Sequence, residues 1–119
     1  MEAHQKLEQN IDLSCCSRIQ LDISNADRYP GTVSLELIVI NHDFGHSEFS
    51  LGKAMVMSIP DITQDPVKPV SETLDFAVPS DFSGRTINEF KVIYQRVRGR
   101  TDKSVKVAIE CFVLVPRGM

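Results

Sequence analysis

A long run of strand-forming residues near the C-terminus, Val105–Val115, constrains the fold more than any other feature of this sequence. β-Branched and large apolar residues fill most of its positions, and Lys106 and Glu110 are its only charged residues. Such residues are enriched in strands, and an apolar run of this kind is typical of a strand covered on both faces. The pattern therefore predicts that Val105–Val115 is the central strand on which the earlier strands assemble.

Shorter segments before this run also have the pattern of strands. The clearest is Arg18–Ile23, in which Ile19, Leu21 and Ile23 alternate with polar residues. The other predicted strands are Ala3–Leu13, Thr32–Ile40, Phe49–Ile59 with a bulge at Gly52, Val70–Val78 and Ile87–Val97. No segment keeps a helical period over three turns. Short strands separated by turn residues predict an all-β sandwich or barrel.

Length and composition are those of one globular domain, spanning residues 1–119. Apolar residues make up 42% of the chain and the formal charge is −3, which gives no overall attraction to nucleic acid. The sequence contains no apolar run long enough to cross a membrane, and its first ten residues lack the apolar core of a signal peptide. We therefore expect a soluble, cytoplasmic protein, unless the chain is excised from a larger secreted or membrane-associated one.

Three cysteines leave their oxidation state open. Cys15 and Cys16 are adjacent, and Cys111 lies in the C-terminal run. In a reducing compartment all three are expected to be thiols. The alternative is one disulfide from Cys15 or Cys16 to Cys111, which requires the first strands to lie beside the last.

Several segments together resemble the galactose-binding-like jelly roll, the fold of many carbohydrate-binding modules. The first is the turn Asn10-Ile-Asp-Leu-Ser14 followed by the alternating Arg18–Ile23. The second runs through Leu74–Phe82 and Ile87–Ile93 to Val107–Leu114, and is similar to the closing strands of that superfamily. The resemblance implies a jelly-roll-like antiparallel β-sandwich of about seven to eight strands. It also implies a carbohydrate as one candidate ligand.

The chain departs from the sugar-binding members of that superfamily in its aromatic residues. Sugar sites usually present aromatic rings as platforms, but this sequence has no Trp and only two Tyr, Tyr29 and Tyr94. Tyr94 shares a strand face with Phe90 and Val92, which predicts that it belongs to the core. Tyr29 lies in a predicted loop beside Pro30 and is the remaining candidate for a ligand contact.

A candidate metal site occupies the predicted turn after Ile40. His42, Asp43, His46 and Glu48 are all side chains that zinc or a similar ion accepts, and Gly45 lies among them. A solvated hairpin turn has the same composition, because polar residues and glycine are what turns contain. No other feature of the sequence predicts a cofactor.

A second candidate site is basic. Arg96, Arg98 and Arg100 recur at every second position, so that on a continuing strand they emerge on one face and present bidentate donors to an anionic partner. The alternative is a charged strand edge that prevents aggregation. Arg85–Lys106 contains seven basic and two acidic residues, which gives this segment a local charge of +5.

Motifs of catalysis are missing from the sequence. It has no Gly-x-Ser-x-Gly and no phosphate-binding loop, so an enzyme is not expected. The sequence predicts a non-catalytic binding or accessory module with a protein or carbohydrate partner. The alternative is a structural protein-interaction domain without a small ligand.

Overall fold

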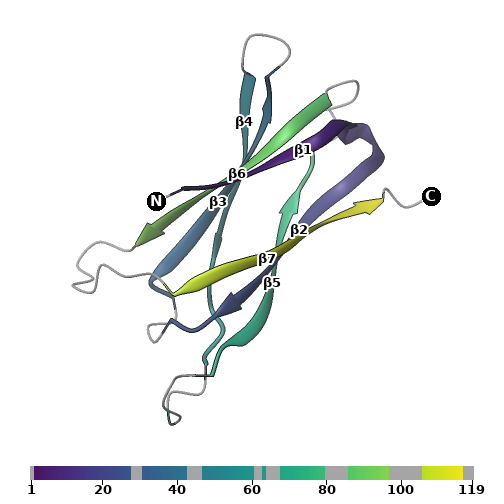
Figure 1. The fold of residues 1–119 in the computed structure, drawn as a ribbon. Helices are drawn as coiled ribbons and strands as arrows, with labels where there is room; N and C mark the ends of the chain where they lie inside the picture. The colour runs from purple at the N-terminus through teal and green to yellow at the C-terminus, as the bar shows by residue number, and fades with distance from the viewer. Residues whose placement is uncertain are drawn as a thin grey trace.

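The computed structural model describes residues 2–27, 31–42, 47–60, 63, 68–79, 86–96 and 106–116. The only helical element among them is a single 3-10 turn, η1 (Leu13–Cys15). The strands are β1 (Glu2–Asp12), β2 (Cys16–Asn25), β3 (Val33–Asn41), β4 (Ser47–Met55), β5 (Val70–Ala77), β6 (Thr86–Arg96) and β7 (Val107–Pro116) (Figure 1). These bounds confirm the seven predicted strands to within a few residues, except that β4 ends before Ile59.

The strands form two antiparallel sheets that pack face to face. Sheet A has four strands in the order β1-β6-β3-β4, and sheet B has three in the order β5-β2-β7. Apart from the β3–β4 pair, each strand is followed in sequence by a strand of the other sheet. This wrapping confirms a jelly-roll-like β-sandwich, an architecture whose full form has eight strands.

The central strand of sheet B is β2, not the C-terminal run, so that prediction was wrong. β2 pairs with β5 on one side and with β7 on the other, whereas β7 is an edge strand. Ile19, Leu21 and Ile23 of β2 are fully buried, as their alternation predicted. Ile109 of β7 is only half-buried, and Val113 on the outer face is 39% exposed. The prediction failed because an apolar run indicates that a segment is a strand but does not determine the place of that strand in its sheet.

The core lies between the inner faces of the two sheets. On β3, Val33, Leu35, Leu37 and Val39 alternate inward and are buried, as predicted. Ile40 is also buried although it points to the outer face of sheet A. The other core residues include Leu13, Val56, Leu74, Phe76, Val78, Ile87, Phe90 and Val92.

The predicted bulge at Gly52 is present. The register between β3 and β4 shifts between Glu36 and Ile38, and Gly52 has a φ of 108°. Residues with a Cβ rarely adopt this backbone conformation, so glycine suits the position.

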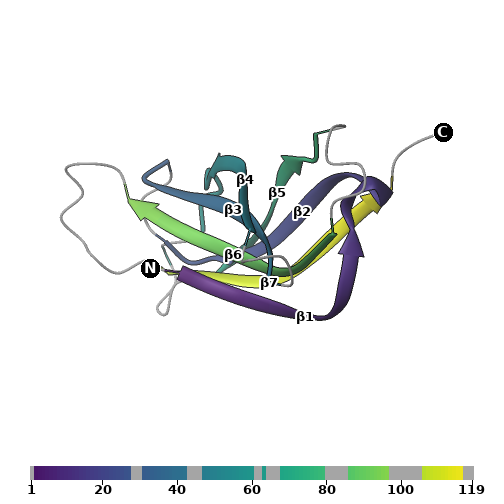
Figure 2. The same cartoon turned by 90° about the horizontal axis from the view of Figure 1, so that it is seen from above.

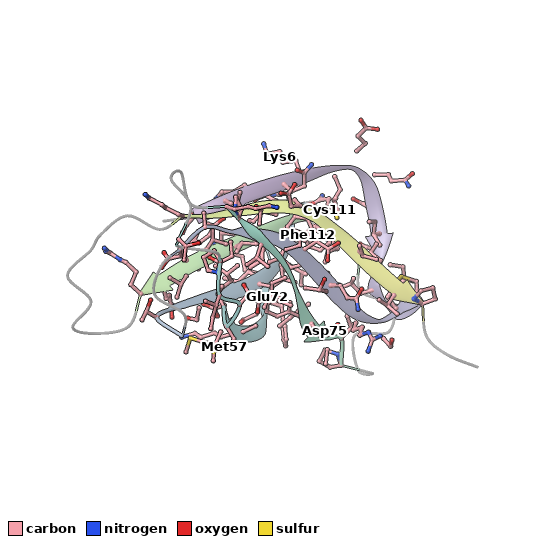
Figure 3. The ribbon with its side chains drawn as sticks, turned by 90° about the horizontal axis from the view of Figure 1, so that it is seen from below. Lys6, Met57, Glu72, Asp75, Cys111 and Phe112 are labelled. Atoms are coloured by element: carbon pink, nitrogen blue, oxygen red, sulfur yellow. A yellow bond between two sulfur atoms is a disulfide. The ribbon has the colours of Figure 1, made fainter. Side chains whose placement is uncertain are left out.

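One side of the sandwich, between β4 and β5, is closed by the segment that follows β4. The N–H of Val56 donates to the Val33 carbonyl at 2.9 Å, which holds the segment to sheet A. The N–H groups of Met57 and Ser58 donate to the Glu72 carboxylate at 3.2 and 2.9 Å. Glu72 is the acidic residue on the otherwise apolar face of β5 and is half-buried, whereas Asp75 on the other face is exposed; both are labelled in Figure 3. Its inward position is explained by these two bonds.

The buried amide of Asn25 holds the same segment to sheet B. Its Nδ2 donates to the carbonyl of Ser58 at 3.0 Å and to the Ser58 hydroxyl at 2.9 Å. Its Oδ1 accepts from the N–H of Asp27 at 2.9 Å.

No helix in the described part of the chain is long and apolar enough to span a membrane.

Candidate functional site

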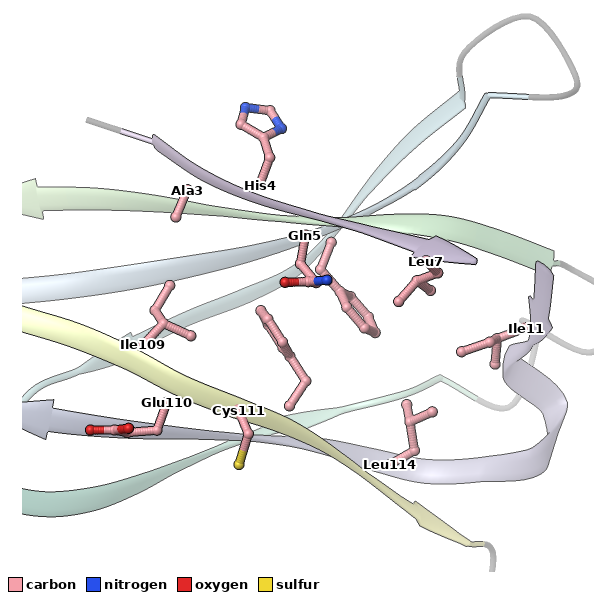
Figure 4. A pocket seen from close by; sticks show the side chains of 11 residues that line it. Ala3, His4, Gln5, Leu7, Ile11, Ile109, Glu110, Cys111 and Leu114 are labelled. Atoms are coloured by element: carbon pink, nitrogen blue, oxygen red, sulfur yellow. The ribbon is translucent and has the colours of Figure 1, made fainter. Parts of the chain in front are cut away.

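The opposite side of the sandwich, between the edge strands β1 and β7, is open. A cavity of about 470 Å³ lies there, within the range typical of ligand sites. Figure 4 shows Leu7 and Ile11 of β1 pointing towards Leu114 and Ile109 of β7 across this space. We call it the β1–β7 groove. Its apolar lining consists of Ala3, Leu7, Ile11, Phe90, Ile109, Phe112 and Leu114.

Two stacked aromatic rings form the floor of the β1–β7 groove. The rings of Phe90 on β6 and Phe112 on β7 lie nearly parallel, with centroids 4.6 Å apart and an angle of 17° between their planes. Phe90 is only 2% exposed, whereas Phe112 is half-buried. The contact joins the two sheets and gives the groove a rigid apolar base.

An irregularity in β1 shapes the wall opposite β7. Lys6 pairs with Glu89 and Ile11 with Ile87, so residues 7–10 of β1 lie opposite Asn88 alone. Figure 2 shows β1 bending strongly towards η1 in this part. Leu7 and Ile11, at the two ends of the irregular stretch, both line the groove, while the three residues between them are exposed.

Polar groups lie at the rim. Gln5 extends its amide over the opening (Figure 4) and donates from Nε2 to the Lys6 carbonyl at 3.1 Å. Glu110 of β7 is exposed beside the opening. Cys111 points away from the cavity, and its thiol donates to the Asp22 carboxylate at 3.3 Å. This hydrogen bond raises the pKa of the Cys111 thiol, so the group is less readily ionised than an ordinary cysteine.

The most buried carboxylate of sheet A, Glu89, lies between two imidazoles on the outer face. Its Oε2 is 2.6 Å from His4 Nδ1, and its Oε1 is 2.8 Å from His42 Nε2. The side chain of Glu89 is 5% exposed, and those of His4 and His42 are 45% and 40% exposed. The bond to His4 is the main cause that lowers the pKa of Glu89, and it likewise raises the pKa of His4.

The structure leaves the predicted metal cluster untested. Of its four members, His42 and Glu48 are described, whereas Asp43 and His46 lie outside the described residues. His42 bonds to Glu89, and Glu48 bonds to Lys91 Nζ at 2.5 Å. No group of three potential metal ligands is found among the described residues. The metal site that includes His46 stays a prediction.

The predicted basic site and the predicted tyrosine contact are also untested. Arg96 ends β6 opposite Val33 and is exposed. Arg98, Arg100 and Tyr29 lie outside the described residues, so the row of arginines and the tyrosine contact stay predictions. Tyr94 packs against the core, as its strand face predicted, and burial raises its pKa.

The cysteines follow neither of the two expectations. Cys15 and Cys16 form a disulfide with each other, at the junction of η1 and β2. Cys111 is a free, exposed thiol on β7. Strands β2 and β7 do lie side by side. However, Cys16 lies opposite Pro116 and Cys111 lies opposite Asp22, so the two cysteines are not neighbours in the sheet.

The sequence pattern does not predict which residues line the β1–β7 groove. Leu7, Ile11 and Leu13 were visible as the few apolar residues of a polar strand, and Leu7 and Ile11 are the two that line the groove. The pairing of β1 with β6 across more than seventy residues of sequence has no local signal, so the groove could not be assembled from the pattern alone. Comparison with family models, with curated proteins and with solved structures gave no match.

Proposed function

We propose that this protein is a non-catalytic binding module whose ligand places an apolar body in the β1–β7 groove. The observation that carries the proposal is the cavity of about 470 Å³ between two edge strands, with a mainly apolar lining. Ligand sites are typically concave, apolar and bordered by a few polar groups, and Gln5 and Glu110 are such groups here.

The chemistry of the lining supports binding rather than catalysis. Both ring nitrogens of His4 are bonded to carboxylates, Nδ1 to Glu89 at 2.6 Å and Nε2 to Glu2 at 3.2 Å. Cys111 points away from the groove and its thiol pKa is raised. A nucleophile needs an adjacent base within hydrogen-bonding distance, and His4 and Cys111 do not form such a pair.

A carbohydrate ligand has less support than an apolar one. Pyranose rings stack on exposed aromatic faces, but Phe90 and Phe112 stack on each other, and Phe90 is buried. Aliphatic side chains form most of the remaining lining. We therefore assign the groove to an apolar ligand.

An uncharged fluorescent hydrophobic dye, Nile red, tests this proposal. We expect saturable binding to the folded protein, with NMR shift changes that centre on Ile109, Phe112 and Leu114. Leu114→Lys should weaken dye binding at least tenfold because it places a charge in the groove. Val113→Lys is the matched control, since Val113 is the next residue on β7 and is 39% exposed on the other face.

Two results would overturn the assignment. One is equal dye affinity in the two lysine variants. The other is a set of shift changes centred on Met57 and Ile59, which are 60% and 71% exposed at the β4–β5 side. Thermal melting of each variant shows whether it is folded before its affinity is compared.

A further inference from the structure

In the part of the chain that the structure describes, sheet B has one strand fewer than sheet A, and the strand position that sheet B lacks lies at the groove. β6 faces β7 across the core through the Phe90–Phe112 stack, and the segment after β4 contacts β5 on the other side. β1 pairs with β6 on the side away from β3, so it lies one strand position beyond β7. No described strand of sheet B lies opposite β1. The groove therefore has the position of a strand.

The edge of β7 is suited to pairing with another strand. Its only charged residue is Glu110, and Cys111–Val115 is an uninterrupted stretch without charge. The other edge strands carry charges along their length, namely Glu2, Lys6, Glu8 and Asp12 on β1, Glu48 and Lys53 on β4, and Glu72 and Asp75 on β5. Charges on an edge prevent pairing with further strands, and a long apolar edge favours it.

We propose that the β1–β7 groove binds an extended segment of a partner polypeptide, which adds to β7 as an antiparallel strand opposite β1. This inference rests on the proposed function and names the class of its ligand. Alternate side chains of such a segment would enter the cavity between Leu7 and Leu114, while its backbone would pair with the edge of β7 that no described strand covers. The remaining side chains would lie beside Val113 on the outer face.

The occupant is a single segment rather than the sheet edge of a second copy. In a second copy, β6 would cover β7 through the same Phe90–Phe112 contact. If the two β7 strands paired edge to edge, β1 of the first copy would have to lie where β6 of the second copy lies. Two layers cannot occupy that space, whereas a segment without a second layer fits beneath β1.

Charge at the rim indicates the composition of the segment. Glu110 is exposed at the opening, and Asp22 lies on the neighbouring strand β2, opposite Cys111. A lysine or arginine at an outward position of the bound segment would complement these carboxylates. The proposed partner is thus an extended segment with apolar residues at alternate positions and a basic residue between them.

Selection from a random octapeptide display library tests the inference, with the Leu114→Lys variant used to remove peptides that bind elsewhere. We expect the selected peptides to alternate apolar and polar residues and to be enriched in lysine or arginine. The best peptide is then synthesised in two N-methylated forms, each methylated at one alternating set of its amides. In an added strand only one set faces β7, so one form should bind at least tenfold more weakly and the other less than twofold.

The variants separate this inference from the proposed function. Leu7→Lys, which takes no part in the selection and changes the irregular part of β1, should abolish peptide binding. Ser71→Lys, on the exposed face of β5 at the other edge of sheet B, is the control and should retain it. If dye binds in the groove but no peptide is selected, or if both N-methylated forms bind like the parent, strand addition is wrong while the binding module stands. If neither dye nor peptide binds the wild-type protein, both proposals fail.

Discussion

The strand order of sheet B, which positions the groove, can be tested by comparing two truncations to alanine, one on β2 and one on β7. Leu21 on β2 is fully buried between the sheets. Truncation of such a leucine removes apolar contacts and leaves a cavity, so Leu21→Ala should cost about 3–5 kcal/mol of the free energy of unfolding. Urea denaturation measures this loss as a lower midpoint with an unchanged slope.

Ile109 on β7 should behave differently because it is half-buried beside an existing opening. Each fully buried carbon is worth about 0.8 kcal/mol, and Ile109→Ala removes roughly three carbons at about half burial, so the expected loss is ~1 kcal/mol. Val113→Ala on the outer face is the control and should change stability by less than about 0.5 kcal/mol. Equal losses for Leu21→Ala and Ile109→Ala would refute the strand order, because both strands would then have to be central.

Three further predictions concern contacts away from the groove. The Glu89–His4 bond stabilises the fold when Glu89 is ionised and His4 is protonated. At the acid side, this stability is fully present above the ordinary pKa of a glutamate and is lost as pH falls through the lowered pKa of Glu89. At the alkaline side, it is fully present below the ordinary pKa of a histidine and is lost as pH rises through the raised pKa of His4. His4→Gln should therefore lower the melting temperature most near about pH 5.5 and least near about pH 9; a loss independent of pH would contradict this. Gly52→Ala should cost about 1–2 kcal/mol in urea denaturation because of its φ of 108°, although no atom lies within 4 Å of the added Cβ, and an unchanged midpoint would refute the strain. Asn25→Ala should cost about 1–3 kcal/mol because it removes two bonds to Ser58, and should speed proteolysis after β4; wild-type protease resistance would show that the segment is held by other contacts.

The strands themselves could be predicted from the sequence because alternation is a local property. Arg18–Ile23 and Thr32–Ile40 show one apolar face, and those faces are buried as expected. The bulge at Gly52 was also predictable, since an isolated glycine in a strand pattern marks such an irregularity. These features depend on residues within a few positions of one another.

Strand order and the groove could not be predicted, because they depend on contacts between distant residues. Nothing near Glu89 in the sequence indicates that it is flanked by His4 on β1 and by His42, the residue that follows β3. The glutamate is buried because its neighbours in space cover it, although its position on β6 is that of an outward, polar residue. The lining of the groove has the same character, since β1 and β7 come from the two ends of the chain.

The error about the C-terminal run is informative for the same reason. The apolar run predicted a central strand, yet β7 has β2 on one side and no described strand on the other. Natural edge strands are usually protected by charge, and Cys111–Val115 has none. Strand addition accounts for both observations, because a segment bound opposite β1 would give β7 its second neighbour. The pattern that predicted a central strand would then describe β7 in the complex rather than in the isolated chain.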